Sequence, residues 1–377
     1  MTARDIRYQL ALKGKPDNAL THEATLIEVE QQADCPATFR IQFALDLCDG
    51  DFQLLRDDRL KPSTNDDPLS VLVTVDNDTR CLIHGIITGR SAHLVHGGPG
   101  SYLEVIGEER RRVMDREYKS AVYDGKASDI ARSILESHGF EVDAAETTID
   151  YDEERVQLVQ TGTDHAFLTR LAALNNLRFW VDYEVSGTAT VTETAHFKPS
   201  PERPQSSFGL PALPNPLAPN ETPELTINTT SDKCASILSF DVHDSAEVVN
   251  QVPLQQRINL DDAALDETTN IVPTNDPLNQ TPPPQRLISS RLVTAGSTEE
   301  ARLQNEAALD DASWSVSLTV STTVFALGGV VQPHQFIKLV GSGEHTDGQY
   351  FVEAVTHRID VVDHKMTLTL KSNSLGD

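Results

Sequence analysis

The apolar and polar positions in the first third of the chain alternate in the manner of short β-strands. Alternating, β-branched runs predict six strands separated by turn signals. Pro16–Asn18 and Asn77-Asp78 are expected to be turns, because Asn and Asp tolerate turn backbone angles. Residues 1–117 are therefore predicted to form a first β-barrel module. The six predicted strands are Asp5–Lys13, Ala24–Glu30, Ala37–Leu47, Leu69–Asp76, Thr79–Ser91 and Ser101–Gly107.

A helical period replaces this alternation in the middle of the chain. Four residues have the spacing of one apolar helix face: Phe167, Leu168, Leu171 and Leu174. Thr163 or Asp164 can cap the start of this helix, and Asn175-Asn176 can end it. Residues 118–197 are therefore predicted to form a small α+β domain. Its other predicted elements are helix Ile130–His138 ended by Gly139, strand Arg155–Gln160, and the aromatic strand Leu177–Glu184.

The last third of the chain returns to strands, and residues 225–377 are predicted to form a second β-barrel module. Its order of strand, turn, long strand, turn and strand after residue 330 matches that of residues 69–107, which suggests an internal repeat. Ser297 and Glu300 have the spacing of a helix capping box. The predicted elements are strands Val248–Asn259 and Arg286–Val293, helix Thr298–Ala312, and strands Trp314–Phe325, Gln349–Val361 and Lys365–Asn373, and the segment Val330–Val340 is predicted to end in a strand. The fold class expected is α+β, mostly β, with two similar antiparallel modules flanking the small domain.

Two proline-rich stretches interrupt this plan. Residues 198–224 contain proline at a density that prevents regular helix or sheet, so they are predicted to be a linker or a surface loop. A second such loop, at about residues 260–285, is predicted inside the second module.

Composition restricts the classes of partner. The chain carries 57 acidic and 31 basic side chains, a formal net charge of -26, which argues against nucleic-acid binding. The one basic run, Glu108–Arg112, is predicted to be a solvated charge cluster at a strand end. No apolar segment is long enough to cross a bilayer, so no stable membrane insertion is expected. The scattered cysteines are predicted to be free thiols: Cys35, Cys48, Cys81 and Cys234.

No catalytic, cofactor-binding or metal-binding motif is recognisable in the sequence. His93 and His96 have no third ligand nearby, and Asp76 and Asp78 lack the glycine and distal glutamate of a calcium loop. His357 is predicted to be a hydrogen-bonded structural side chain. The chain is therefore predicted not to be an enzyme, although an enzyme with an unrecognised site stays an alternative.

Two longer patterns are more specific. The first consists of Gly162, Thr163, Asp164, Phe167, Leu168, Arg170, Leu171, Ala172, Phe179 and Val181, and the second of Gly348, Tyr350, Val352, Val355, His357, Ile359 and Asp360. With these patterns, the chain resembles phage late control protein D and the hub part of type VI and other contractile-tail spike proteins. The resemblance is close over Tyr118–Glu184 and loose over the whole chain. It implies that the matched residues have structural roles.

The resemblance implies a structural baseplate hub, made in the cytoplasm and assembled into a phage tail or tail-like particle. Three copies would adapt a six-fold inner tube to a three-fold spike, in contact with other baseplate proteins. Because the sequence ends soon after the last predicted strand, the spike is expected to be a separate protein. The alternative function is a tail-associated cell-wall hydrolase or carbohydrate-binding component. The acidic charge has two open interpretations: a lumen that repels polyanions, or solubility and adaptation to salt.

Overall fold

The structure is a computed structural model that describes most of the chain. The described residues are 4–45, 53–62, 66–96, 99–152, 157–200, 222–227, 235–244, 248–256, 270–271, 277–279, 285–288, 291–293 and 298–376. Most of the proline-rich stretch 198–224 and of the second loop therefore lies outside the described residues. Ser297, Cys48 and Cys234 lie outside them as well, whereas Cys35 and Cys81 are free thiols as predicted.

All six strands predicted in the first third are present. Their alternation places one face of each in the core, as in β4, where Ala37, Phe39, Ile41 and Phe43 are buried. The strands are β1 (Ile6–Leu12), β2 (Lys15–Pro16), β3 (Ala24–Gln32), β4 (Cys35–Ala44), β5 (Pro68–Val75), β6 (Asp78–His93) and β7 (Tyr102–Glu109). Short helical segments connect them: α1 (Asn18–Glu23), α2 (Gln53–Arg56), η1 (Asp58–Leu60) and η2 (Arg110–Asp115).

Both predicted turns in this region were placed imprecisely. Asp17 does not belong to a simple turn but caps α1, because its side chain accepts a hydrogen bond from the Leu20 amide. The tight turn between β5 and β6 is formed by Asp76 and Asn77, which both have positive φ.

The last third follows the predicted order with shifted boundaries, but its strand Ile237–Asp244 was not predicted. Helix α5 spans Thr298–Ala312, as predicted. Val324 and Phe325 were predicted to be strand but belong to the short helix α6, whose start Thr323 caps. The strands are β15 (Glu224–Thr226), β16 (Ile237–Asp244), β17 (Val248–Gln256), β18 (Asn270–Ile271), β19 (Gln285–Ile288), β20 (Arg291–Val293), β21 (Val316–Thr323), β22 (Phe336–Val340), β23 (Gly348–Asp360) and β24 (His364–Ser372), with α6 at Val324–Leu327.

The internal repeat is present in the strand pairing. We call β3 to β7 the first motif, with neighbour order β3-β4-β7-β6-β5. We call β16 and β21 to β24 the second motif, with neighbour order β16-β21-β24-β23-β22. Every neighbouring pair in both motifs is antiparallel. The predicted fold class, mostly β with two similar antiparallel regions and a small α+β domain, is confirmed.

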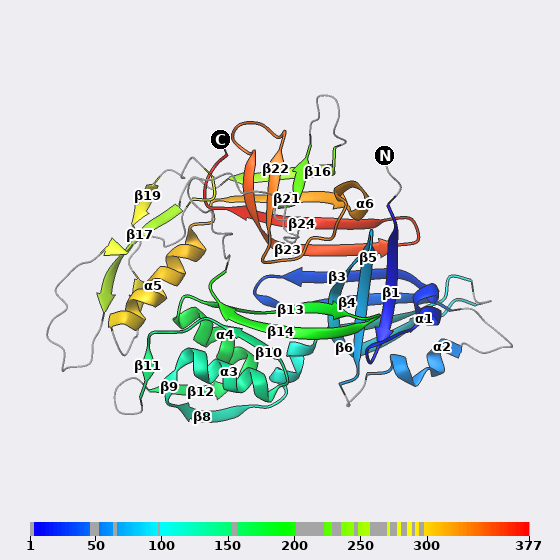
Figure 1. Ribbon diagram of the computed structural model, residues 1–377, viewed down its shortest axis with the longest axis horizontal. Helices are drawn as coiled ribbons and strands as arrows, with labels where there is room; N and C mark the ends of the chain where they lie inside the picture. Colours follow the sequence, from blue (N-terminus) through cyan, green and yellow to red (C-terminus); the bar gives the residue numbers. More distant parts are fainter. Residues whose placement is uncertain are drawn as a thin grey trace.

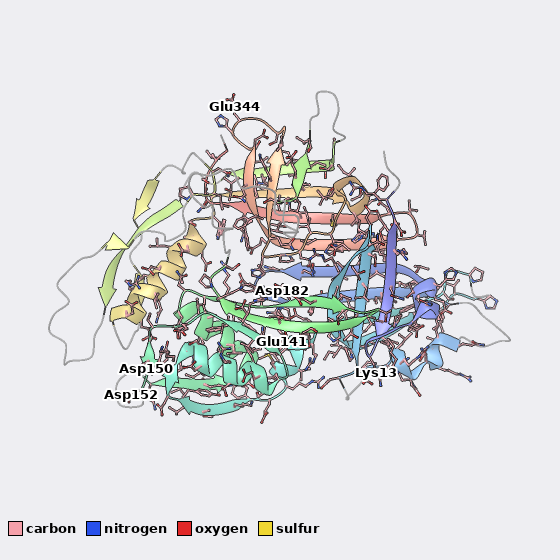
Figure 2. The ribbon with its side chains drawn as sticks, in the orientation of Figure 1. Lys13, Glu141, Asp150, Asp152, Asp182 and Glu344 are labelled. Atoms are coloured by element: carbon pink, nitrogen blue, oxygen red, sulfur yellow. The ribbon has the colours of Figure 1, made fainter. Side chains whose placement is uncertain are left out.

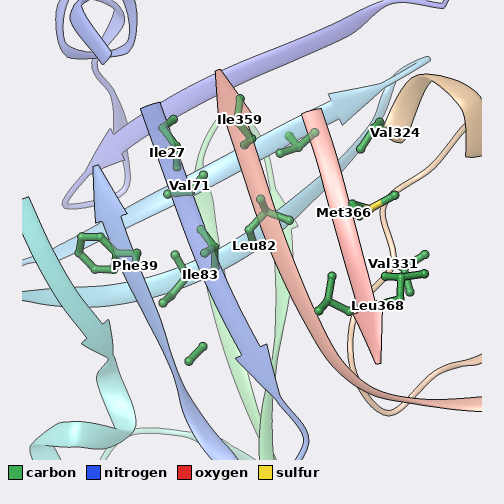
Figure 3. Close-up of a cluster of buried hydrophobic side chains, with 14 of the residues drawn as sticks. Ile27, Phe39, Val71, Leu82, Ile83, Val324, Val331, Ile359, Met366 and Leu368 are labelled. Atoms are coloured by element: carbon green, nitrogen blue, oxygen red, sulfur yellow. The ribbon is translucent and has the colours of Figure 1, made fainter. Parts of the chain in front are cut away.

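The two motifs are joined edge to edge, which the sequence did not indicate. Strand β23 of the second motif pairs with β3 of the first, so that 13 strands of the described chain form one sheet. Figure 1 shows the red β23 beside the blue β3, although they are far apart in sequence. Figure 3 shows that side chains of both motifs share one hydrophobic core, in which Ile27 lies near Ile359.

The small domain has its own core and lies beside the sheet (Figure 1). Helices α3 and α4 pack against a three-stranded sheet of order β10-β14-β13. Helix α3 starts three residues before the predicted Ile130, and Gly139 ends it with a positive φ. The elements are β8 (Lys119–Tyr123), β9 (Gly125–Lys126), α3 (Ala127–Ser137), β10 (Glu141–Ala144), β11 (Asp150–Tyr151), β12 (Leu158–Gly162), α4 (Asp164–Leu174), β13 (Arg178–Ser186) and β14 (Thr190–Lys198).

Acidic side chains are exposed on several parts of the surface. Glu141, Asp150 and Asp152 lie on the small domain, and Glu344 lies in the turn between β22 and β23 (Figure 2). No helix in the described ranges is long and apolar enough to cross a membrane.

Candidate functional site

The first family pattern forms the start of helix α4. Thr163 caps the helix by accepting a hydrogen bond from the Ala166 amide, and its hydroxyl donates to Asp115 at 2.7 Å. Gly162 precedes the cap with a φ of +149°, a value that side-chain-bearing residues rarely adopt. The pattern therefore needs glycine and then threonine to bring the chain from β12 into α4.

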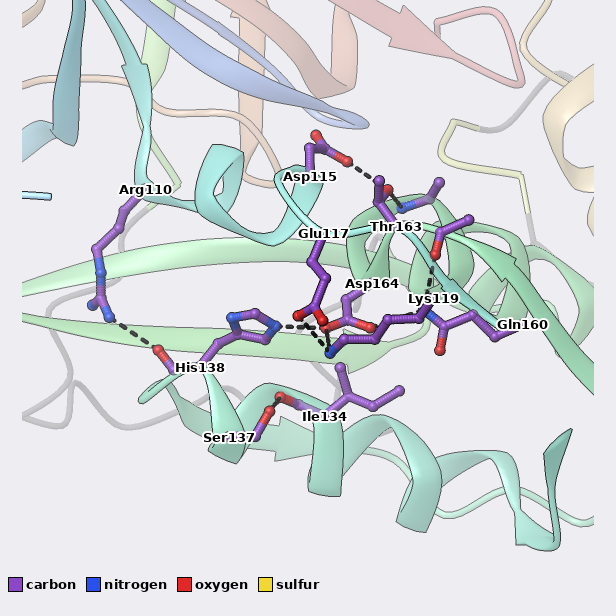
Figure 4. A network of polar contacts seen from close by, with 12 residues as sticks. Arg110, Asp115, Glu117, Lys119, Ile134, Ser137, His138, Gln160, Thr163 and Asp164 are labelled. Atoms are coloured by element: carbon purple, nitrogen blue, oxygen red, sulfur yellow. Dashed lines mark hydrogen bonds and ion pairs between the residues drawn. The ribbon is translucent and has the colours of Figure 1, made fainter. Parts of the chain in front are cut away.

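Asp164 is the centre of a buried polar network (Figure 4). One carboxylate oxygen accepts from Lys119 Nζ at 2.6 Å and from His138 Nε2 at 2.7 Å, and the other accepts from Gln160 Nε2 at 2.8 Å. Burial alone would raise the pKa of Asp164, but the hydrogen bonds from Gln160, Lys119 and His138 outweigh it and lower the pKa. Asp164 therefore ties α4 to β8, β12 and the end of α3.

The remaining residues of the first pattern pack the small domain. Phe167, Leu168 and Leu171 are buried in its core. Arg170 lies on the exposed side, where its guanidinium donates to the Val159 carbonyl at 2.5 Å and lies over the Phe167 ring. The pattern thus has a packing role in this domain.

The second pattern forms β23 and its turns. Gly348 has a φ of +151°, and a Cβ there would lie 2.4 Å from Oδ1 of Asn279, so that a side chain would be excluded on two grounds. Tyr350 is buried and donates its hydroxyl to the Thr346 carbonyl, while Val352 lies in the core. Asp360 ends the strand, and its carboxylate accepts from the Val362 and Asp363 amides.

His357 lies at the junction of the two motifs, as a hydrogen-bonded side chain within the core. Its Nε2 donates to Oε1 of Gln31 in β3, and its Nδ1 accepts from Nε2 of His364 in β24, both at 3.1 Å. Gln31 in turn donates to the Leu82 carbonyl in β6 at 2.7 Å. Burial, with a smaller contribution from His364, lowers the pKa of His357 well below its ordinary value, so the ring is neutral. His357 is thus buried and hydrogen-bonded, and its structural role stays a prediction.

Sequence reasoning missed the residues that attach the small domain to the motifs. Within Glu108–Arg112, Glu109 and Arg111 are buried rather than solvated, and their side chains form an ion pair at 2.6 Å. Arg111 also donates to the carbonyls of Phe179 and Cys35, which belong to the small domain and the first motif. The charge run therefore has an internal role, which the run of charged residues alone does not reveal.

A second contact joins all three parts. His334, just before β22, stacks on Trp180 of β13 with ring centroids 4.2 Å apart, and its Nε2 donates to the Ala33 carbonyl after β3. Burial lowers the pKa of His334 to about 4. The small domain is thus fixed against both motifs at the end of their junction.

No metal centre is assembled in the described ranges. No three His, Cys, Asp or Glu side chains there could hold a metal ion together. His93 stacks on Tyr102, and Asp76 accepts a hydrogen bond from the Asp5 amide. A cavity of about 310 Å³ between α4 and α5 is lined in part by Arg178, which pairs with Asp34 and Asp311.

No protein-family model and no curated protein matches the sequence. Solved structures do match it along nearly its whole length. A tail protein from Neisseria meningitidis MC58 has a TM-score of 0.64 at 14% identity, covering 97% of this chain and 96% of that one. The chain has the fold of phage tail proteins.

Two further solved structures share this tail-protein fold. The 43 kDa tail protein of prophage MuSo2 from Shewanella oneidensis has a TM-score of 0.59 at 12% identity, covering 98% of this chain and 99% of that one. The E. coli c3393 protein, a component of the type VI secretion system, has a TM-score of 0.54 at 13% identity, covering 98% of this chain and 76% of its own. The resemblance inferred from the two sequence patterns is therefore confirmed at the level of fold.

Proposed function

We propose that the chain is a structural hub of a contractile phage tail or a related injection particle, and that three copies form a ring. The observation that carries the proposal is the repeat of one five-stranded motif within a single chain. Three chains around one axis supply six similar motifs, so one face of the ring fits a six-fold tube. The three small domains keep the symmetry of the chains themselves, so the other face fits a three-fold spike.

The proposed action is mechanical and contains no chemical step. The described sheet is continuous across both motifs of one chain, which makes each chain a rigid arc of the ring. The proposed partners are the inner tube protein, a separate trimeric spike and other baseplate proteins. Solved structures support this: the type VI component from E. coli is described as similar to tail proteins gp27 and gp5 of bacteriophage T4, and another match is a chain of the PdpA–VgrG complex from Francisella.

The test is the molar mass of the purified full-length chain, measured by light scattering alone and with the tube and spike proteins of the same particle. The proposal predicts the mass of three copies, and a complex in which three copies join one tube ring to one spike. A mass of one copy under both conditions would contradict it.

A further inference from the structure

Strand pairing aligns the two motifs residue by residue. In the first motif the paired positions run across four strands as Ile27, Ile41, Val105 and Arg90, and in the second as Phe240, Val320, Leu368 and Val355. The long strands β6 and β23 also have a register shift at the same place, between Ile87 and Gly89 and between Val352 and Ala354. Each residue of one motif therefore has a defined equivalent in the other.

The edges of β3 and β23, which are joined within the chain, bury apolar side chains on one face and form an ion pair on the other. Within the chain, β3 pairs with residues Ala354–Asp360 of β23. In this pairing Ile27 lies opposite Ile359, Glu28 opposite Arg358 and Val29 opposite His357. Ile27, Val29 and Ile359 are at most 4% exposed. Glu28 and Arg358 form an ion pair on the outer face.

The equivalent edges at the two ends of the sheet are not joined to any described strand. β16 is the equivalent of β3, with Phe240, Asp241 and Val242 at the positions of Ile27, Glu28 and Val29. Val242 is 36% exposed, whereas Val29 is fully buried. Beyond β16, in the described part of the chain, no strand pairs with its second edge.

The end of β6, Gly89–His93, is the equivalent of Ala354–Arg358 in β23. Ala92 and His93 take the positions of His357 and Arg358, and Leu94 follows directly after β6, in line with Ile359. Leu94 is 52% exposed, whereas Ile359 is 4% exposed. At this end of β6, β7 is the only partner strand among the described residues. Exposed apolar side chains are thus found on both of these edges and at equivalent positions.

We propose that β16 of one copy pairs in antiparallel register with the end of β6 in a second copy of this chain. This inference rests on the proposed ring and names its contacts. Val242 then lies opposite Ala92, Asp241 opposite His93, and Phe240 opposite Leu94.

Chemical complementarity favours a second copy as the occupant. Asp241 and His93 repeat the acid–base order of Glu28 and Arg358 in the covered junction. The apolar side chains meet on the inner face, as Ile27 and Ile359 do. The contact is head-to-tail, since β16 and β6 are different edges, so copies can close into a ring that leaves neither edge free.

Disulfide trapping tests the register in the full-length chain. In a background with serine at positions 35, 48 and 234, Ala92→Cys and Val242→Cys are combined and oxidised. The expected result is covalent dimers and trimers on a non-reducing gel, and none from either single variant. The matched control combines Ala92→Cys with Leu238→Cys, because Leu238 is exposed on the same strand but four residues out of register. It is expected to crosslink at least about tenfold less.

The outcomes separate this inference from the proposed function, because the mass of each variant is measured before oxidation. A trimer that crosslinks equally through position 238, or not at all through position 242, would overturn the pairing and leave the proposed ring intact. A chain that stays monomeric, alone and with the tube and spike proteins, would overturn both.

Discussion

The first and second motifs have the same strand order but differ in what lies at their edges. The second motif has His357 and His364 at the positions where the first has Ala92 and Ser101. His357 is buried where β3 pairs with β23, whereas its equivalent Ala92 is exposed. His364 and its equivalent Ser101 are both buried. Strand order thus follows from each motif's own sequence, but burial depends on the neighbour. An exposed edge that is equivalent to a paired one therefore indicates where a strand of another chain would pair.

The largest expected effect comes from placing a lysine at equivalent positions of the two edges. Ile359→Lys buries an unpaired charge at the covered junction and should lower the free energy of unfolding by more than about 4 kcal/mol. Leu94→Lys should change it by less than about 0.5 kcal/mol in the monomer but prevent assembly. Chemical denaturation and light scattering measure both. Equal destabilisation by the two variants would remove the distinction between covered and free edges.

At one equivalent position near the centre of each motif, substitution by alanine should destabilise the two motifs for opposite steric reasons. Leu370 in β24 is buried, so Leu370→Ala should leave a cavity and cost about 3 kcal/mol. Its equivalent is Gly107 in β7, where a Cβ would lie 2.3 Å from the Ile86 carbonyl and from the Phe39 ring. Gly107→Ala should therefore cost about 2 kcal/mol by overpacking. Urea denaturation measures both, and a neutral Gly107→Ala would contradict the close packing.

The histidine pair should make the second motif sensitive to acid. Burial lowers the pKa of His364 to about 4, from 6.5 in the unfolded chain. Below pH 6.5 the unfolded state therefore binds the proton first, and stability is lost as the pH falls towards 4. Between about pH 8 and pH 5 this loss is on the order of 2 kcal/mol for one such group.

His364→Gln should remove that part of the pH dependence, as measured by denaturation at both pH values. The exposed His22→Gln is the matched control and should leave the pH dependence unchanged. If the two variants have the same pH dependence, His364 is not a buried titrating group.

The smallest expected effect concerns the outer ion pair. Glu28→Gln removes the ion pairs with Arg358 and Arg40 but leaves the apolar contacts, so the free energy of unfolding should change by about 1 kcal/mol. Asp241→Asn at the equivalent position should weaken assembly by a similar amount, more at low than at high salt. Sedimentation at two salt concentrations measures this, and no salt dependence would argue against an Asp241–His93 contact.

Local patterns in the sequence predicted local structure well. Alternation predicted the strands of the first motif and β21 to β24 of the second because one face of each is buried, but it missed β16; α5 has the predicted bounds. Helix α1 was missed because only Leu20 is buried in it, so it has no apolar period. The family pattern indicated the positions of Asp164 and His357 in the chain.

Pairings between distant residues could not be predicted in the same way. The contact of β3 with β23 joins segments more than 300 residues apart, and neither strand's pattern specifies its neighbour. The partners of Asp164 and His357 come from other elements, so their roles appeared only in the fold. Glu109 and Arg111 were assigned to solvent because a local charge run does not show which members are covered by another domain.

The most direct test of the account is imaging of the purified full-length chain by negative-stain electron microscopy. The account predicts closed rings of three copies in which six similar lobes surround one axis. Single particles of one copy, or assemblies with two-fold symmetry, would contradict it.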